Sequence, residues 1–330
     1  MDPLKGRSIL GINELTPDEI QFILSVSQDF KRKWRCGEPH EYLRGKSLAG
    51  VFNTQSTRTS CSFETAMTAL GGHMLWLDKH RIWAGEAGAE NWHDTVKTLT
   101  RYVHGIAHRP VTREMLEETA ALATVPVINA SCPVEHPTQA FADVMTMMEH
   151  GGGSVKGAKV AFCWGYGELN PPAGLTNSTL AMATRLGFDV SIACPEGMDP
   201  DPRYVKEAMD GQADAGNRIE IVHSYEEATK DADFINIYGW VSPEIFAEGP
   251  ATGYRGNPEF AAYKHTLKHW IVDEKVVSSA PKRVKVMHCL PAARGEEVTD
   301  GVLDGPNSII FDEAENRMHT IKALLALLMA

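Results

Sequence analysis

Apolar and polar residues alternate along the first half of the chain in a pattern that predicts repeated strand–helix units. An amphipathic helix is expected first, over residues 16–34, with Pro17 in its first turn and Ile20, Ile23 and Leu24 on one face. Short apolar runs of strand length follow at residues 48–52, 73–77, 103–107 and 125–129. Segments with helical spacing separate them, at residues 63–70, 93–101 and 112–122. This alternation indicates a parallel sheet with helices on both faces.

The second half of the chain repeats the pattern. A helix over residues 136–150 ends at Gly151-Gly152-Gly153-Ser154, where we place a domain boundary. Strands are then expected at residues 159–164, 189–194, 219–222, 233–238, 284–288 and 308–311, before a final helix over residues 313–328. The predicted fold class is therefore α/β, with two doubly wound parallel-sheet domains at residues 1–150 and 151–330.

The turn between the first predicted strand and the following helix carries a dense set of hydrogen-bond donors. Ser56, Thr57 and Thr59 flank Arg58, and further hydroxyls follow. A strand that delivers such a turn to a helix N-terminus forms an anion site, because backbone N–H groups and the helix dipole point outward there. The alternative is simple helix capping, but capping needs one hydroxyl, and the capping-box position before Glu64 holds a cysteine. Phosphate binding is the favoured interpretation.

A glycine motif in the second half raises a competing cofactor hypothesis. Gly165-Tyr166-Gly167 follows the strand predicted at residues 159–164, as a dinucleotide-binding turn would. The third glycine of that fingerprint is replaced by Asn170, so dinucleotide binding is disfavoured.

Composition narrows the class of protein further. The 330 residues carry a net charge of −11, which argues against a general nucleic-acid or membrane-surface binder. No apolar run approaches the roughly 20 residues that span a bilayer, and no apolar segment of a signal peptide follows the first residues. The six cysteines show no paired metal spacing. We expect reduced thiols, a cytoplasmic location and no metal or other cofactor.

Four short motifs, in order along nearly the whole chain, resemble those of the aspartate and ornithine carbamoyltransferase family. They are Ser56-Thr57-Arg58-Thr59-Ser60, His136-Pro137-Thr138-Gln139, His288-Cys289-Leu290-Pro291 and Asp312-Glu313-Ala314-Glu315-Asn316-Arg317. The resemblance implies transfer of a carbamoyl group from carbamoyl phosphate to an amine, without a metal or a covalent enzyme intermediate. It also implies that the last helix returns to the first domain and brings Arg317 beside the turn at residues 56–59.

The resemblance assigns the donor site residue by residue. It implies that the phosphate is held by Ser56, Thr57, Arg58, Thr59 and Arg109, although Arg109 alone would be interpreted as a solvated charge at a strand end. It implies that the carbamoyl group is bound by His136, Gln139, Cys289, Leu290 and Arg317. Independently of the resemblance, His136 and Gln139 lie three apart at a helix start, so both side chains can face one point. The sequence shows no histidine-and-base pair, beyond the adjacent His288, that would activate Cys289 as a nucleophile. Cys289 is therefore expected to contact and orient the substrate rather than attack it.

The acceptor motif departs from the family pattern. Ornithine carbamoyltransferases carry Asp-x-Trp-x-Ser-Met-Gly, whose aspartate and serine hold the α-amino group. The matching stretch here is Tyr238-Gly239-Trp240-Val241-Ser242-Pro243-Glu244, which keeps Trp240 and Ser242 but replaces the aspartate with Tyr238. The natural partner of an α-ammonium group is therefore missing, and free ornithine becomes a less obvious acceptor.

A long stretch at residues 165–178, ending in Asn177 and Ser178, also departs from the ornithine enzymes. It is similar to the insertion of the knotted N-acylornithine carbamoyltransferases, whose acceptor has an uncharged α-nitrogen. The basic residue that some of those enzymes place at position 238 is absent, and residues 288–298 resemble ordinary ornithine enzymes more. An acylated ornithine therefore leads narrowly over ornithine, and other amines remain open. The resemblance implies that the acceptor is bound by Asn177, Tyr238, Trp240, Ser242, Leu290 and Trp83.

The loop at residues 79–86, with Trp83, follows the second predicted strand. In relatives this loop reaches a neighbouring subunit's active site, which implies a homotrimer with shared sites; an ordinary surface loop is the alternative.

The alternative from another class of function is a non-catalytic family member that binds carbamoyl phosphate or another small anion. The intact His-Pro-x-Gln and Cys-Leu-Pro stretches favour the enzyme, because binding alone does not require donors to the carbonyl group.

Overall fold

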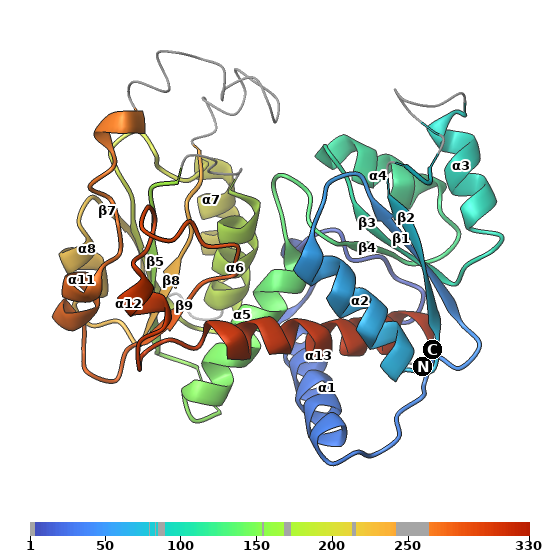
Figure 1. Cartoon of the computed structure of the whole chain (residues 1–330), viewed down its shortest axis with the longest axis horizontal. Helices are drawn as coiled ribbons and strands as arrows, with labels where there is room; N and C mark the ends of the chain where they lie inside the picture. The colour runs from blue at the N-terminus through green and yellow to red at the C-terminus, as the bar shows by residue number, and fades with distance from the viewer. Residues whose placement is uncertain are drawn as a thin grey trace. The chain divides into compact units, whose positions relative to one another are not determined.

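The computed structural model divides the chain into two compact units. It describes residues 4–78, 80–82, 84, 90–153, 155–167, 173–212, 216–241 and 264–330. Unit 1 comprises residues 1–145 and 315–330, and unit 2 comprises residues 146–314. Each unit is built around its own parallel sheet (Figure 1).

Unit 1 contains a four-stranded sheet in the order β2-β1-β3-β4. Its strands are β1 (Ser47–Phe52), β2 (His73–Asp78), β3 (Gly105–Arg109) and β4 (Val127–Asn129). All neighbouring strands pair in parallel. Its helices are α1 (Pro17–Arg35), α2 (Thr57–Ala69), α3 (Trp92–Leu99) and α4 (Arg113–Leu122). Helix α5 (Pro137–His150) begins in unit 1, and its residues from Thr146 onward belong to unit 2. The four predicted strands of this half are confirmed within two residues at each end.

The core of unit 1 follows from the alternation of side chains along β1. Ala49 and Val51 are fully buried in a cluster with Trp92 and Val96 of α3 and with Leu116 of α4. The intervening residues of β1 point to the opposite sheet face, because successive side chains of a strand alternate. Both faces are therefore covered, as parallel sheets require.

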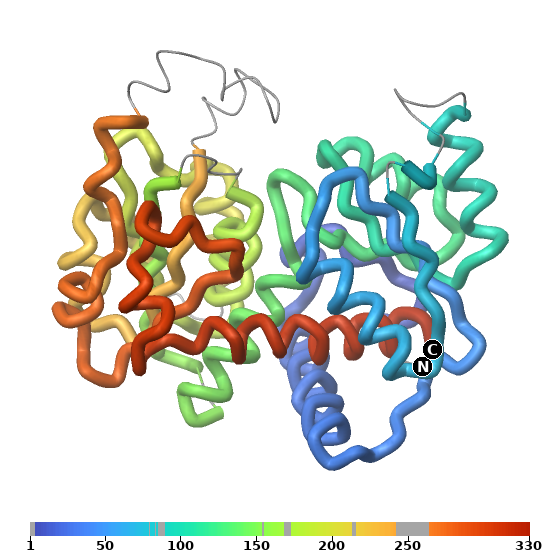
Figure 2. The backbone as a smooth tube through the Cα atoms, in the orientation of Figure 1, coloured from blue at the N-terminus to red at the C-terminus, as the bar shows by residue number. Residues whose placement is uncertain are grey.

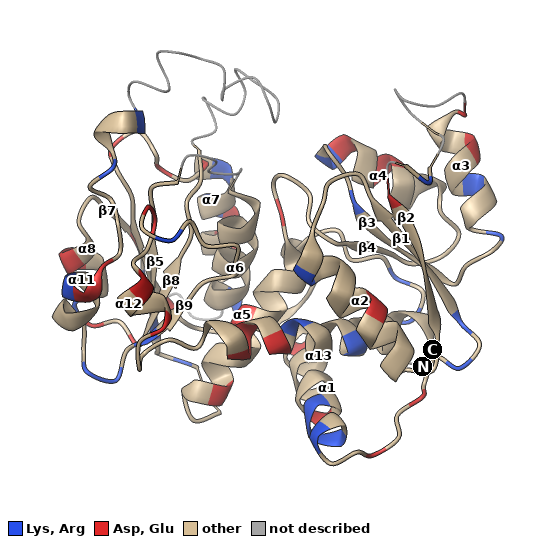
Figure 3. Cartoon of the chain, viewed as in Figure 1, with Lys and Arg blue, Asp and Glu red and all other residues tan. Residues whose placement is uncertain are grey.

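Helix α1 begins with a complete capping box. The Thr16 hydroxyl accepts a hydrogen bond from the Glu19 N–H, and the Glu19 carboxylate accepts one from the Thr16 N–H. Acidic residues occupy its first turn and basic residues its last, where Figure 3 shows blue stretches of ribbon at the end of the helix. This charge distribution complements the helix dipole.

Unit 2 contains a five-stranded parallel sheet in the order β7-β6-β5-β8-β9. Its strands are β5 (Lys159–Cys163), β6 (Asp189–Ala193), β7 (Ile219–Val222), β8 (Phe234–Ile237) and β9 (Lys285–Met287). Its helices are α6 (Gly174–Arg185), α7 (Pro202–Asp210), α8 (Tyr225–Thr229), α11 (Glu274–Ser279) and α12 (Asp300–Leu303). Helices α6 and α7 cover one side of this sheet, and α8 and α11 cover the other (Figure 1). The doubly wound class is confirmed.

One predicted strand is wrong. Residues 308–311 form only an isolated bridge, between Ser308 and Val286 of β9, and α13 (Ile310–Met329) begins within them. A short apolar run does not distinguish a buried strand from a buried helical turn. The helical pattern of the segment predicted at residues 313–328 includes the three residues before it, so the helix begins at Ile310.

Helix α13 contributes its residues from Glu315 onward to unit 1. The predicted return of the last helix to the first domain is therefore confirmed. Figure 2 shows the C-terminal end of this helix beside the N-terminal segment, and the Gly6 N–H donates to the Leu328 carbonyl at 3.0 Å. Among the residues with described positions, no helix is both long and apolar enough to cross a membrane.

Candidate active site

The turn between β1 and α2 forms a helix N-terminus rich in hydroxyl groups. Ser56 is the N-cap residue, and its Oγ accepts a hydrogen bond from the Thr59 N–H at 3.3 Å. Helix α2 therefore starts at Thr57, six residues before the predicted start at residue 63. The Ser60 hydroxyl donates to the Ser56 carbonyl at 2.7 Å, so this hydroxyl finds its partner within the first turn of the helix. The Ser56 cap is compatible with the predicted anion site, since only one hydroxyl caps and the first-turn N–H groups and Arg58 lie at the same helix end.

A cavity of about 660 Å³ opens at this turn. The helix end supplies Ser56, Thr57 and Ser60, and β2 supplies Trp76 and Asp78. The remaining lining residues are Phe52, Asn53, Thr54, Gln55 and His80. The cavity therefore combines hydroxyl donors with one acidic side chain.

Arg109 ends β3 beside the same turn. Its Nε donates to the Thr54 hydroxyl at 2.9 Å, and one Nη donates to the Ala130 carbonyl at 3.3 Å. The strands β1 and β3 are neighbours at the point where the strand order reverses, which is where ligands bind in doubly wound sheets. The fold thus brings the predicted phosphate residues of two separate segments to one edge.

Helix α13 places Arg317 against three predicted site residues. Its guanidinium donates to the Thr59 hydroxyl at 3.0 Å, to His136 Nε2 at 3.2 Å and to the Gln139 carbonyl oxygen. Arg317 is only 3% exposed, and Thr59, His136 and Gln139 are also buried. The Gln139 amide in turn donates to Asp143 at 2.7 Å, which fixes its orientation. Four residues from three distant segments therefore meet at one point, as expected from the sequence.

His136 is held as a neutral imidazole. Burial lowers its pKa well below 6.5, and the charges of Arg317 and Arg109 lower it further. Arginine can only donate, so His136 Nε2 accepts from Arg317 and Nδ1 carries the proton, 3.3 Å from the Thr138 hydroxyl. A neutral histidine beside a buried arginine avoids charge repulsion within the site.

In unit 2, the residues after β9 form a second predicted part of the site. Leu290 has a φ of 56°, in the left-handed region that a branched residue occupies at a cost of about 1–3 kcal/mol. The Leu290 N–H donates to His288 Nδ1 at 2.8 Å, and the His288 N–H donates to the Glu313 carboxylate at 2.9 Å. Cys289, between them, is partly exposed. These bonds fix the backbone that presents Cys289 and Leu290.

His288 lies 3.1 Å from a second carboxylate, that of Glu297. Glu297 also packs tightly against Gly165, where a Cβ atom would lie 2.5 Å from the Glu297 Cβ. Gly165 is therefore explained by close packing in unit 2, which accounts for the glycine without a dinucleotide.

The acceptor motif is anchored by a chain of indole hydrogen bonds. Trp164 Nε1 donates to the Trp240 carbonyl at 2.7 Å, and Trp240 Nε1 donates to the Met198 carbonyl at 2.8 Å. Tyr238 follows β8 and is half-buried, and its N–H bonds to the Cys163 carbonyl. Asn177 lies buried in α6. Two other predicted acceptor residues, Trp83 and Ser242, lie outside the described residues, as does part of each loop at residues 79–86 and 165–178.

Two family models match almost the whole chain. Residues 7–149 match the aspartate/ornithine carbamoyltransferase carbamoyl-P binding domain, and residues 156–328 match the Asp/Orn binding domain of the same family. The chain belongs to the aspartate/ornithine carbamoyltransferase family. The ornithine carbamoyltransferase of Pyrococcus horikoshii is 41% identical over 99% of this chain and 96% of its own length. That of Methanosarcina mazei is 40% identical over 98% and 99%.

Solved structures of both ornithine carbamoyltransferases and acetylornithine transcarbamylases resemble this fold. The ornithine carbamoyltransferase from Pyrococcus furiosus has a TM-score of 0.87 at 39% identity, covering 99% of this chain and 98% of that one. An acetylornithine transcarbamylase complexed with acetylcitrulline also has a TM-score of 0.87, at 30% identity and with coverage of 98% and 99%. The overall fold therefore does not separate the two kinds of carbamoyltransferase.

Several residues that support this carbamoyltransferase site were not predicted from the sequence. Asp143 orients Gln139, Thr138 contacts His136, and Glu313 holds the backbone before Cys289. Each lies within or near a quoted motif, but the bond it makes depends on tertiary contacts. Asp78 and Trp76 reach the cavity from the end of β2, and the position of that strand end beside β1 is the signal that could have identified them.

His108 gives the site a pH-dependent support. Its ring is fully buried and tilted against Trp92, with the ring centroids 5.4 Å apart, and it lies 3.0 Å from the Asn53 side chain that lines the cavity. Burial lowers its pKa from 6.5 to about 3. Between these pH values the unfolded chain binds a proton at His108 that the folded chain does not. The contribution of His108 to the unfolding free energy is therefore fully present above pH 6.5 and is lost as the pH decreases toward 3.

We therefore predict that His108 accounts for about 2 kcal/mol of the unfolding free energy lost between pH 7 and pH 5. His108→Gln should reduce that loss by this amount in urea titrations at the two pH values. His93→Gln, at an exposed histidine, is the control and should leave the difference unchanged. An unaltered pH dependence in His108→Gln would show that this imidazole is not responsible.

Proposed function

We propose that this family member transfers the carbamoyl group of carbamoyl phosphate to the side-chain amine of ornithine or an ornithine-like amino acid. Phosphate and a citrulline-type product are released. The observation that carries the proposal is the meeting of Arg317 with Thr59, His136 and Gln139 beside the N-terminus of α2. An anion-binding helix end next to buried donors matches a substrate that joins a phosphate to a carbonyl group.

The phosphate of the donor is proposed to bind at the start of α2. The first-turn N–H groups, the hydroxyls of Ser56, Thr57 and Thr59, and the guanidinium of Arg58 would supply hydrogen bonds and positive charge. Arg109 would add a second guanidinium from the end of β3. Arginine suits this role because its planar fork binds phosphate oxygens in pairs.

The carbonyl group of the donor is proposed to lie against Arg317, His136 and Gln139. Negative charge gathers on the carbonyl oxygen when an amine attacks, and buried donors already in position stabilise it. A donor of this kind is typically worth about 10²–10³ in rate. In unit 2, Cys289 and the Leu290 carbonyl are proposed to contact the carbamoyl amine and the incoming amino group.

The reaction itself needs no electron donor or acceptor. The lone pair of the acceptor amine forms the new C–N bond, the bond between the carbonyl carbon and the phosphate oxygen breaks, and the amine loses a proton. A free alkyl amine has a pKa near about 10, so the reactive neutral form must be favoured when it binds. Water must also be kept from the donor, since hydrolysis would waste it.

A non-catalytic family member that only binds the donor is the rival function. It would need the anion site at α2 but not a buried guanidinium held against His136 and Gln139. The contacts of Arg317 therefore favour catalysis over binding alone.

The acceptor is proposed to be an ornithine whose α-nitrogen is acylated. Tyr238 supports this proposal, because it replaces the carboxylate that would pair with an α-ammonium group. Unmodified ornithine is the second candidate, and the names of the relatives about 40% identical to this chain favour it. Trp240, Ser242, Asn177, Leu290 and Trp83 are proposed to complete the acceptor site.

The protein is further proposed to act as a cytoplasmic homotrimer with Trp83 entering a neighbouring subunit's site. The resemblance of the loop at residues 79–86 supports the trimer. None of the six cysteines forms a disulfide, and three of them are buried, which agrees with a reducing compartment.

Arg58→Ala should reduce turnover at least a hundredfold, because the phosphate loses its most strongly bound positive partner. Circular dichroism and the urea midpoint should stay near those of the unmodified protein. Arg101→Ala, at an exposed arginine of unit 1, is the matched control and should keep full activity. Near-normal turnover in Arg58→Ala would mean that the phosphate binds elsewhere.

An acceptor panel tests the role of Tyr238. Ureido product should form from N-acetylornithine or N-succinylornithine in preference to ornithine, lysine, 2,4-diaminobutyrate or putrescine. Tyr238→Asp should shift kcat/KM toward ornithine by about tenfold to a hundredfold, the equivalent of one hydrogen bond to a charged group. Tyr238→Asn, which adds no charge, should not do so. Efficient turnover of ornithine by the unmodified protein would refute the acylated acceptor.

The trimer is tested by light scattering after size-exclusion chromatography. The mass should be three times the 36.3 kDa of one chain. Mixing the inactive Arg58→Ala and Trp83→Ala variants under conditions that exchange subunits should restore activity. Some sites in the mixed trimers then combine an intact Arg58 from one subunit with an intact Trp83 from its neighbour. An active monomer, or no recovery on mixing, would contradict shared sites.

A further inference from the structure

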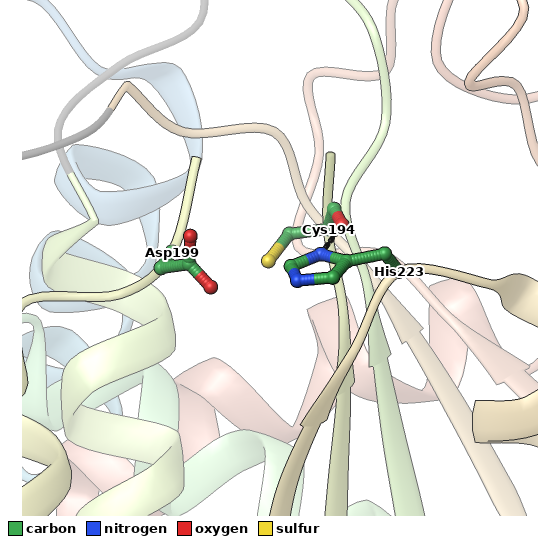
Figure 4. Close-up of side chains that lie close together, drawn as sticks. All are labelled: Cys194, Asp199 and His223. Carbon is green, nitrogen blue, oxygen red and sulfur yellow. Dashed lines mark hydrogen bonds between the residues drawn. The ribbon is translucent and has the colours of Figure 1, made fainter. Parts of the chain in front are cut away.

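Three side chains that could bind a metal ion gather at one edge of the unit 2 sheet. Cys194 follows the last residue of β6, and His223 follows the last residue of β7. Asp199 lies in the loop after β6. One ligand atom from each lies within 4.8 Å of the others, and Figure 4 shows the three side chains facing a common gap.

The arrangement of His223 suits it to be a metal ligand. Its Nδ1 lies 2.8 Å from the Cys194 carbonyl oxygen and must donate to it, because a carbonyl can only accept. Nε2 is therefore the nitrogen with a free lone pair, and it faces the gap (Figure 4). A histidine that binds metal through one nitrogen commonly donates from the other to a backbone carbonyl.

The donor set is that of a borderline-soft cation. Thiolate, imidazole and carboxylate are the three ligand types of zinc in proteins, with bond lengths of about 2.0–2.3 Å. Such bonds place tetrahedral ligands about 3.3–3.6 Å apart, so the three side chains need to close by only about 1 Å. Calcium and magnesium prefer oxygen ligands alone and do not fit this set.

Cys194 is buried, and the Asp199 carboxylate is the acidic ligand group nearest to its thiol in this cluster. Zinc binds cysteine as the thiolate, so binding would release the thiol proton to solvent.

We propose that Cys194, Asp199 and His223 form a binding site for a zinc-class divalent cation, with a fourth position for solvent. The site is separate from the predicted carbamoyl phosphate residues, none of which belongs to it. The proposal departs from the expectation of no metal. The sequence does not reveal the site, because His223 is brought to Cys194 by strand pairing and not by close spacing along the chain.

A bound ion would tie residues 194–199 to the end of β7. The same loop carries the Met198 carbonyl that accepts the hydrogen bond of the Trp240 indole. Occupancy would therefore hold the anchor of Trp240 as well as the two strand ends. The alternative is that Cys194 only fills space and His223 only caps a carbonyl, in which case no ion binds.

The test uses the full-length protein after treatment with a chelator. Isothermal titration with Zn²⁺ should show one site per chain that is weakened at least tenfold in Cys194→Ser and in His223→Gln. Titration with Co²⁺ should give a sulfur-to-cobalt charge-transfer band and the visible bands of a tetrahedral site. Both spectral features should disappear in Cys194→Ser.

Matched controls separate this site from other thiols and histidines. Cys163→Ser changes a buried thiol on the neighbouring strand β5, and His269→Gln changes an exposed histidine whose Nδ1 also contacts a backbone carbonyl. Cys289→Ser tests binding at the predicted active site. All three should retain the cobalt spectrum, and circular dichroism should confirm that every variant is folded. Equal Zn²⁺ affinity in Cys194→Ser and the unmodified protein, or a spectrum lost only in Cys289→Ser, would overturn the proposal.

Discussion

The site in unit 1 depends on a single buried guanidinium. Arg317 reaches from the C-terminal helix to Thr59, His136 and Gln139, which come from two other helices and a turn. Burying this charge is costly, and it is supported here by hydrogen bonds to uncharged partners. A dianionic donor at the adjacent helix N-terminus would supply the opposite charge. This constraint explains why the last residues of the chain belong to the first unit.

The two sheets place the chemistry where their topology allows it. In unit 1 the strand order reverses between β1 and β3, whose ends carry the hydroxyl turn and Arg109. In unit 2 it reverses between β5 and β8, whose ends carry Trp164 and the segment from Tyr238 to Trp240. Ligands of doubly wound sheets bind at such points. The donor motifs resemble the family pattern, whereas the acceptor motif departs from it at Tyr238, where ornithine carbamoyltransferases carry an aspartate.

Much of this arrangement could be predicted from the sequence, because strand-length apolar runs and four ordered motifs are local signals. Helix α2 starts earlier than predicted, since hydroxyl residues disfavour helix interiors but favour helix starts, where Ser56 caps the Thr59 N–H. The strand at residues 308–311 was wrong because a short apolar run has no distinguishing period. The supports from Asp143 and Glu313, and the meeting of Cys194 with His223, depend on tertiary contacts between segments far apart in the sequence.

The central claim is that Arg317, together with His136 and Gln139, activates carbamoyl phosphate for attack by an amine. The most direct test follows carbamoyl phosphate labelled with ¹³C by ³¹P and ¹³C nuclear magnetic resonance. Phosphate release should occur only when an ornithine-type acceptor is present, and the labelled carbon should appear in the ureido product in equal amount. Release of phosphate at the same rate without acceptor, or binding of the donor with no labelled product, would contradict the account.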